Sequence, residues 1–142
     1  MGNTIVWALF PILVMDPALD PRFDLSLQLY TVPLNILMSM AGSTLMATSI
    51  SLIINQALSV RDLVQAPSAG AVAICSAAFY IIRPVYAIGI GCLAGLIQTL
   101  FQNFVEKRAA RKHQIIHTFS FIFGIQGIFG CIYAAVFRAI LK

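Results

Sequence analysis

Long stretches without charge constrain this chain more than any other feature of its sequence. No Asp, Glu, Lys or Arg occurs in the 36 residues 25–60 or in the 25 residues 113–137. Two further stretches, residues 63–82 and 84–105, contain 20 and 22 uncharged residues. A helix needs about 20 apolar residues to cross the hydrocarbon core of a bilayer. Each stretch is therefore long enough for one crossing.

The composition supports the same interpretation. Only 10% of the 142 residues are charged, 60% are hydrophobic, and the mean hydropathy is +0.91. A soluble domain has about a quarter charged residues, because its surface faces water. So few charges cannot cover a globule of 15.5 kDa, and most of the surface must therefore face lipid. We predict an all-α fold, a polytopic transmembrane helix bundle embedded in a lipid bilayer.

We treat residues 1–142 as a single transmembrane domain with five apolar segments. The first segment, residues 3–15, contains a proline and is too short for a straight crossing, so we interpret it as a short or kinked span, or as one whose beginning has been lost. It lacks the basic region and the small-residue cleavage site of a secretory signal peptide. The four predicted full spans are residues 27–54, 63–82, 85–105 and 114–137.

The loops between the spans predict the orientation of the chain. Arg83 and Pro84 predict a tight turn between antiparallel helices, and residues 106–113 form a polar loop with four basic side chains. The positive-inside rule places this loop on the cytoplasmic or matrix side. A basic loop can also bind nucleic acid, but four charges beside a bilayer favour lipid contact, so we predict no nucleic-acid partner. The membrane itself, mitochondrial inner membrane or plasma membrane, stays open.

Small residues indicate where the helices touch. Residues 68–71 read Ser-Ala-Gly-Ala, residues 89–95 contain three glycines, and the last span repeats glycine at a spacing of three. In lipid, close backbone approach and van der Waals packing hold such helices together. We therefore expect a tightly packed bundle. The glycines predicted to lie in helix contacts are Gly70, Gly91, Gly95, Gly124, Gly127 and Gly130.

The cysteines and histidines do not form a recognisable metal or catalytic pattern. Cys75, Cys92 and Cys131 lie in apolar spans without paired metal-ligand spacing, so we interpret them as small hydrophobic residues. His113 and His117 are four residues apart, a spacing that can bind a metal, but no third ligand is near in sequence, which favours histidines at the membrane boundary. The spans contain neither paired carboxylates nor a Ser-His-Asp arrangement that can be placed. We predict no cofactor, no metal and no enzymatic activity.

Several motifs follow one another in an order typical of one membrane protein family. Residues 63–75 (LVQAPSAGAVAIC) are followed by the turn at Pro84 and by residues 91–100 (GCLAGLIQTL). Residues 2–11 have the spacing Gly-x4-Trp-x3-Pro, and residues 124–130 contain the repeated glycines. Together these motifs resemble the Rh branch of the Rh/Amt ammonium transporter superfamily over nearly the whole chain. The resemblance implies a truncated and degenerate member that corresponds to about the sixth to tenth of eleven spans.

The resemblance also implies which residues correspond to the pore. In the family, ammonium gives up a proton at an outer vestibule and passes a narrow hydrophobic pore lined by two histidines. Ser120 corresponds to one of these histidines, and His117 lies about one helical turn away. Phe119 and Phe123 crowd the same region, and Phe101 stands where the family has glycine. Bulky rings narrow a passage, and loss of the imidazole removes a proton relay.

Two functional hypotheses follow from this comparison of motifs. The departures from the family pattern favour a non-conducting structural or accessory subunit of a larger membrane assembly, with other membrane protein subunits as partners. The alternative is a component of an ammonia or ammonium channel, in which another chain or a homo-oligomer supplies the remaining spans.

Overall fold

The computed structural model describes residues 9, 11–12, 25–56, 60–78, 80–81, 83–108 and 114–140. Within these ranges the fold is all-helical, as predicted, with four long helices in the order α2 (Leu25–Asn55), α3 (Val60–Cys75), α4 (Pro84–Arg108) and α5 (Gln114–Ile140). The short N-terminal segment predicted at residues 3–15 lies almost entirely outside the described part of the chain.

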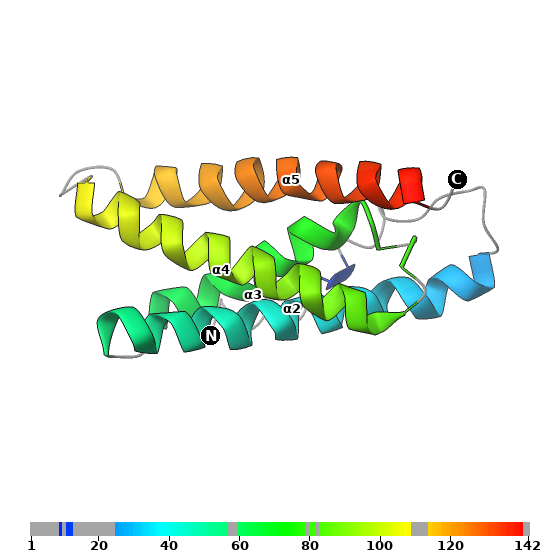
Figure 1. Cartoon of the computed structure of the whole chain (residues 1–142), viewed down its shortest axis with the longest axis horizontal. Helices are drawn as coiled ribbons and strands as arrows, with labels where there is room; N and C mark the ends of the chain where they lie inside the picture. The colour runs from blue at the N-terminus through cyan, green and yellow to red at the C-terminus, as the bar shows by residue number, and fades with distance from the viewer. Residues whose placement is uncertain are drawn as a thin grey trace.

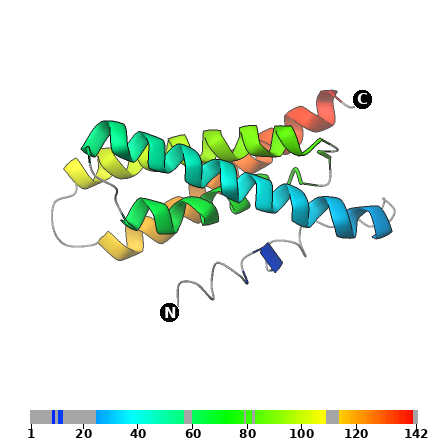
Figure 2. The same cartoon turned by 90° about the horizontal axis from the view of Figure 1, so that it is seen from below.

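Consecutive helices run in opposite directions along one long axis (Figure 1). Helix α2 packs against both α3 and α4, and α3 also packs against α4. Helix α5 lies on the other side of α3 from α2 and has little contact with α4, from which it separates towards the right of Figure 1. Figure 2, seen from below, shows α2 and α4 side by side along most of their length. Helix α3 is therefore the central element of the bundle.

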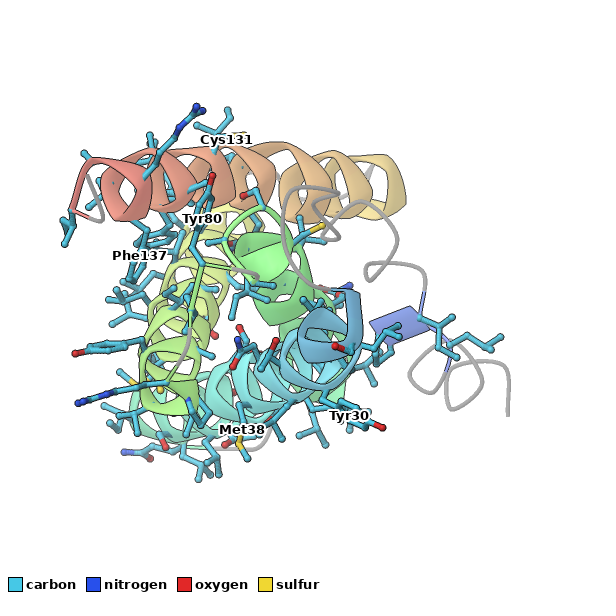
Figure 3. The ribbon with its side chains drawn as sticks, turned by 90° about the vertical axis from the view of Figure 1, so that its right-hand side faces the viewer. Tyr30, Met38, Tyr80, Cys131 and Phe137 are labelled. Carbon is cyan, nitrogen blue, oxygen red and sulfur yellow. The ribbon has the colours of Figure 1, made fainter. Side chains whose placement is uncertain are left out.

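The distribution of side-chain size and polarity is the reverse of that in a soluble protein. The core consists largely of alanine, with Ser39, Ser43 and other polar side chains fully buried among it. Large apolar side chains point outwards instead; Tyr30, for example, is 80% exposed and points away from the bundle in Figure 3. The outward-facing set includes Leu37, Leu45, Leu52, Ile53, Val85, Leu93, Leu100, Phe104, Ile128, Ile132 and Ile140. Such a surface is stable against lipid but not against water.

Two helices of the described chain are long and apolar enough to cross a membrane. They cover Leu29–Ile54 and Pro84–Phe104, each with a mean hydropathy of 1.6. The 26 residues of the first helix extend for about 39 Å at 1.5 Å per residue, more than the roughly 30 Å of a hydrocarbon core. The apolar parts of α3 and α5, Leu63–Cys75 and Gly124–Ile140, are shorter.

The bundle is held together where the backbone of α2 touches glycines of its neighbours. A Cβ added to Gly91 would collide with the carbonyl oxygen of Ser39, and one added to Gly95 would collide with that of Ser43. Gly70 of α3 meets both serines, since a Cβ there would lie 2.7 Å from the Ser39 carbonyl oxygen and 2.5 Å from Ser43 Oγ. Because nothing larger than hydrogen fits at these three positions, α3 and α4 can both approach α2 at backbone distance.

Two serine hydroxyls reinforce this contact. Ser39 Oγ donates a hydrogen bond to the Gly70 carbonyl oxygen at 2.8 Å, and Ser43 Oγ lies 2.7 Å from the carbonyl oxygen of Ala66. Residues 39 and 43 are four apart on α2, and their two acceptors are four apart on α3. The two hydroxyls therefore bond successive turns of the neighbouring helix, which sets the register between α2 and α3.

Substitution of glycine by alanine at two nearby positions of α4 tests this packing. Gly91→Ala places a methyl group against the Ser39 backbone and should cost about 1–3 kcal/mol of stability, because the backbone must move to make room. Gly89→Ala is the matched control, since no atom in the described part of the chain lies within 4 Å of its Cβ position. The control should be neutral, or stabilise by up to about 1 kcal/mol through helix propensity. The measurement is thermal unfolding in detergent, and equal behaviour of the two variants would contradict the packing described.

The third predicted span is not helical to its end. Continuous helix was expected over residues 63–82, with a tight turn at Arg83 and Pro84, but α3 ends at Cys75. Residues 76–78, 80–81 and 83 form an irregular connection before α4 begins at Pro84, and residues 79 and 82 lie outside the described part of the chain. Proline suits the first position of a helix, and it disfavours helical backbone in the residue before it. The sequence therefore indicated where α4 starts but not where α3 stops.

One asparagine of α2 accounts for the irregular connection. The Nδ2 atom of Asn35 donates to the carbonyl oxygens of Ala78 at 2.9 Å and Ile81 at 2.6 Å. Both acceptor residues are buried, and Asn35 is 1% exposed. Carbonyl groups outside a helix cannot remain unpaired at membrane depth, so such backbone is tolerated only inside the protein with a donor. The Asn35 amide supplies that donor for two carbonyls at once.

Removal of the Asn35 amide should destabilise the connection specifically. Asn35→Leu keeps the approximate volume but leaves two buried carbonyl oxygens without their donor, at a cost of about 1–3 kcal/mol for each. Thr48→Val is the control on the same helix, because Thr48 bonds only locally, to the Leu45 carbonyl oxygen, from a more exposed position. Hydrogen exchange of the amides in residues 76–83, measured with thermal unfolding, should change in the first variant alone. Unchanged exchange in Asn35→Leu would show that the amide does not hold this segment.

Candidate functional site

The pore residues implied by the family resemblance lie on the first turns of α5. His117, Phe119, Ser120 and Phe123 belong to the helix Gln114–Ile140, but their side chains lie outside the described residues. Their proposed positions along a pore therefore stay predictions. Phe101, expected to narrow a passage, is 37% exposed on α4, so its ring is not enclosed within this bundle.

The described part of α5 faces its neighbours with the side that carries Gly130 and Phe137. A Cβ at Gly130 would lie 2.9 Å from the carbonyl oxygen of Ala73 on α3. The Phe137 ring meets that of Tyr86 on α4 edge to face, with centroids 6.4 Å apart and an interplanar angle of 65°. Figure 3 shows Phe137 directed towards α4 and Cys131 directed outwards from the opposite side. One side of α5 is thus assigned to protein contact and the other to the surroundings.

The three glycines of the α5 repeat, all predicted to lie in helix contacts, have different surroundings in the described structure. No atom of the described residues lies within 4 Å of a Cβ placed on Gly124 or Gly127, whereas a Cβ on Gly130 would touch α3. At about 100° per residue, a step of three residues leaves each glycine about 60° away from the previous one, so Gly124 and Gly130 differ by about 120°. The other predicted contact glycines, Gly70, Gly91 and Gly95, all lie against α2.

A chain of three glutamine side chains connects α3 to α4 inside the bundle. Gln102 Nε2 donates to Gln65 Oε1 at 2.9 Å, and Gln98 Nε2 lies 3.4 Å from Gln102 Oε1. Each amide in this chain donates to the next, so the direction is the same throughout. This series of hydrogen-bonded glutamines ends at Gln98 Oε1, which is buried and has no hydrogen-bond partner among the described residues. A buried acceptor without a donor is costly, and such an atom requires an explanation.

A second buried glutamine bridges α5 and α4. Gln126 is 0% exposed, and its Nε2 atom donates to the carbonyl oxygen of Ala94 at 3.1 Å. Its Oε1 atom is buried and unpaired within the described structure. Ser76 Oγ would lie 3.1 Å from a Cβ at Gly130. This hydroxyl is also buried and has no hydrogen-bond partner among the described residues. The three buried side-chain oxygens without a partner in the described chain thus come from α4, α5 and the start of the irregular connection.

Sequence reasoning missed these polar residues. The prediction of spans rested on charged residues, and Asn35, Gln98 and Gln126 carry no charge. A search for amide side chains within apolar stretches would have found all three. It would not have shown which of their atoms are paired, because the partners of Asn35 and Gln126 are backbone carbonyls far away in the sequence.

The described side chains contain no cluster of three His, Cys, Asp or Glu residues that could hold a metal ion. His113 lies outside the described residues, and the side chain of His117 is likewise not described. None of Cys75, Cys92 and Cys131 forms a disulfide. The Cys92 Sγ atom lies 3.5 Å from the Gly42 carbonyl oxygen, in the contact between α4 and α2.

Helices with lipid-compatible outer faces, small residues in their contacts and polar groups enclosed between them define an integral membrane protein with a helix-bundle fold. Comparison with protein families identifies the particular group. The model of the Ammonium Transporter Family matches residues 24–141, which include α2, α3, α4 and α5. The chain belongs to this family. No curated protein and no solved structure gives a significant match.

Proposed function

We propose that the chain forms part of a membrane pathway for ammonia or ammonium. The observation that carries this proposal is the family match over residues 24–141, because transport of ammonium is the function for which the family is named. The match covers all four described helices. The elements that would surround a pathway therefore belong to the matched region.

The polar interior supports a role in transport over a purely space-filling one. Buried amides such as Gln98 and Gln126 are expensive in a membrane bundle, since each polar group that lacks a partner costs free energy. Intramembrane polar groups commonly mark routes of solutes or ions.

A second function, that of a non-conducting accessory subunit, is favoured by one observation. Ser120 stands at the position that the resemblance assigns to a pore histidine, so the titratable group of a proton relay is missing there. In this alternative, the outward side of α5 with Gly124 and Gly127 would contact other membrane protein subunits. Those two glycines leave room for close approach, because no atom of the described chain lies within 4 Å of their Cβ positions.

Measurement of flux in reconstituted vesicles separates the two functions. The purified chain is incorporated into liposomes loaded with a pH-sensitive dye, and ammonia entry is followed after rapid mixing with an ammonium salt. A conducting chain should accelerate the rise in internal pH at least about twofold over protein-free vesicles, and urea entry should be unchanged. The urea control is necessary because defects in the bilayer would raise both rates.

If ammonia entry equals that through lipid alone, conduction by this chain is excluded and the accessory role remains. Isolation from its native membrane in a mild detergent would then identify the subunits that accompany it. A chain that is stable, monodisperse and alone in detergent would exclude the accessory role as well.

A further inference from the structure

All four tyrosines of the chain lie towards one end of the bundle. Helices α2 and α4 begin at this end, and α5 finishes there (Figure 1). The four positions are Tyr30 near the start of α2, Tyr80 in the irregular connection, Tyr86 in the first turn of α4 and Tyr133 near the end of α5. Figure 3 views the molecule from this end. Tyrosine concentrates at the boundary between membrane and water, where its ring contacts acyl chains and its hydroxyl reaches water.

Two exposed arginines lie at the same end. Arg83 directly precedes α4, and Arg138 lies in the last turn of α5. The ring of Phe137, next to Arg138, meets the ring of Tyr86 with centroids 6.4 Å apart. Because Tyr86 follows Arg83 by only three residues, this ring contact brings the ends of both helices to one level. These two arginines are the charged side chains that the structure describes, so no described acidic side chain can pair with either.

The apolar length of α4 places this level at the boundary of a bilayer. The 21 residues Pro84–Phe104 extend for about 32 Å at 1.5 Å per residue, close to the roughly 30 Å of a hydrocarbon core. Arg83 directly precedes this stretch, and the charged residues 106–108 follow it closely. Helix α4 therefore crosses the core once, with Arg83 at the level of the lipid headgroups.

We propose that this end of the bundle binds anionic phospholipids, with Arg83 and Arg138 each contacting the phosphate of a headgroup. A guanidinium group donates two parallel hydrogen bonds to phosphate oxygens, and its charge cannot be lost at the membrane surface. An anionic headgroup supplies the countercharge that the described side chains lack, whereas a zwitterionic headgroup also carries a cation. The proposal does not depend on whether the chain conducts ammonia.

The neighbours of the two arginines suit the rest of a lipid molecule. Val85 and Ile140, each two residues from an arginine, are 71% and 73% exposed. Apolar side chains next to a cation at this level contact the upper part of the acyl chains while the guanidinium group reaches the phosphate. The ring of Tyr86, 55% exposed, lies between these two environments.

Tyrosine fluorescence tests the proposal, because all four tyrosines report on this end alone. The full chain with Trp7→Phe, which removes the single tryptophan, is reconstituted into phosphatidylcholine vesicles. A small fraction of spin-labelled phosphatidylglycerol or spin-labelled phosphatidylcholine is included, with the nitroxide on the acyl chain next to the headgroup. Phosphatidylglycerol should quench about two- to fivefold more strongly, because each arginine near the surface concentrates anionic lipid around it. A nitroxide at the methyl end of the chain should quench less than one next to the headgroup.

Two double variants locate the lipid preference. In Arg83→Gln with Arg138→Gln, the ratio of quenching by the two lipids should fall to about one. Lys107→Gln with Arg108→Gln is the matched control, since it removes the same charge from the opposite end of α4. The control should retain the ratio of the unsubstituted arginines. Inorganic phosphate should lower the ratio no more than sodium chloride of the same ionic strength, because the partner is a lipid and not a soluble anion.

Four outcomes would overturn the proposal. Equal quenching by both lipids would mean that the arginines do not select anionic headgroups, as when acidic residues of the chain neutralise them. Stronger quenching from the methyl end would place the tyrosines away from the membrane boundary. Loss of the ratio in the control variant would indicate a general effect of net charge. Specific competition by inorganic phosphate would identify a site for soluble anions instead of lipid.

Discussion

The contact between the backbone of α2 and the glycines of α3 and α4 is the interaction on which the rest of the structure depends. In lipid, apolar side chains gain nothing by leaving their surroundings for a protein core, so helices associate through close packing and hydrogen bonds. Ser39 and Ser43 provide both, because their carbonyl oxygens meet Gly91 and Gly95 while their hydroxyls bond to α3. Neither neighbour could approach α2 as closely if its glycine carried a side chain.

This close approach has a consequence for α3 and the segment that follows it. Because α3 lies against α2, Asn35 is near enough to donate to Ala78 and Ile81, and irregular backbone can exist inside the bundle. The 16 residues of α3 extend for only about 24 Å, less than a hydrocarbon core of roughly 30 Å. The irregular segment adds length without adding helix. It also contains Ser76, whose buried Oγ atom lies beside Gly130 of α5.

The fold and the membership of the Ammonium Transporter Family could be predicted from the chain itself to a large extent. Charge-free stretches indicated four long helices, and three of them, α2, α4 and α5, have bounds within three residues of those expected. Motifs in residues 63–75 and 91–100 indicated the family, in agreement with the match over residues 24–141. The candidate site was not predicted in the same way. The pore-equivalent residues, among them Ser120, came from resemblance, and the buried glutamines Gln98 and Gln126 were not selected at all.

The sequence by itself determined that this chain must be helical and must lie in a membrane, because hydropathy and the spacing of charges are properties of local composition. It also indicated that glycines would mediate contacts, although a repeat every three residues cannot keep Gly124 and Gly130 on one face. Only the tertiary structure decided which glycines are used, where α3 ends and which amide atoms have partners. The glycine contacts, the end of α3 and several of the amide partners depend on groups far away in the chain, as when Asn35 bonds to a carbonyl 46 residues further on. No local pattern records which atoms such distant segments bring together.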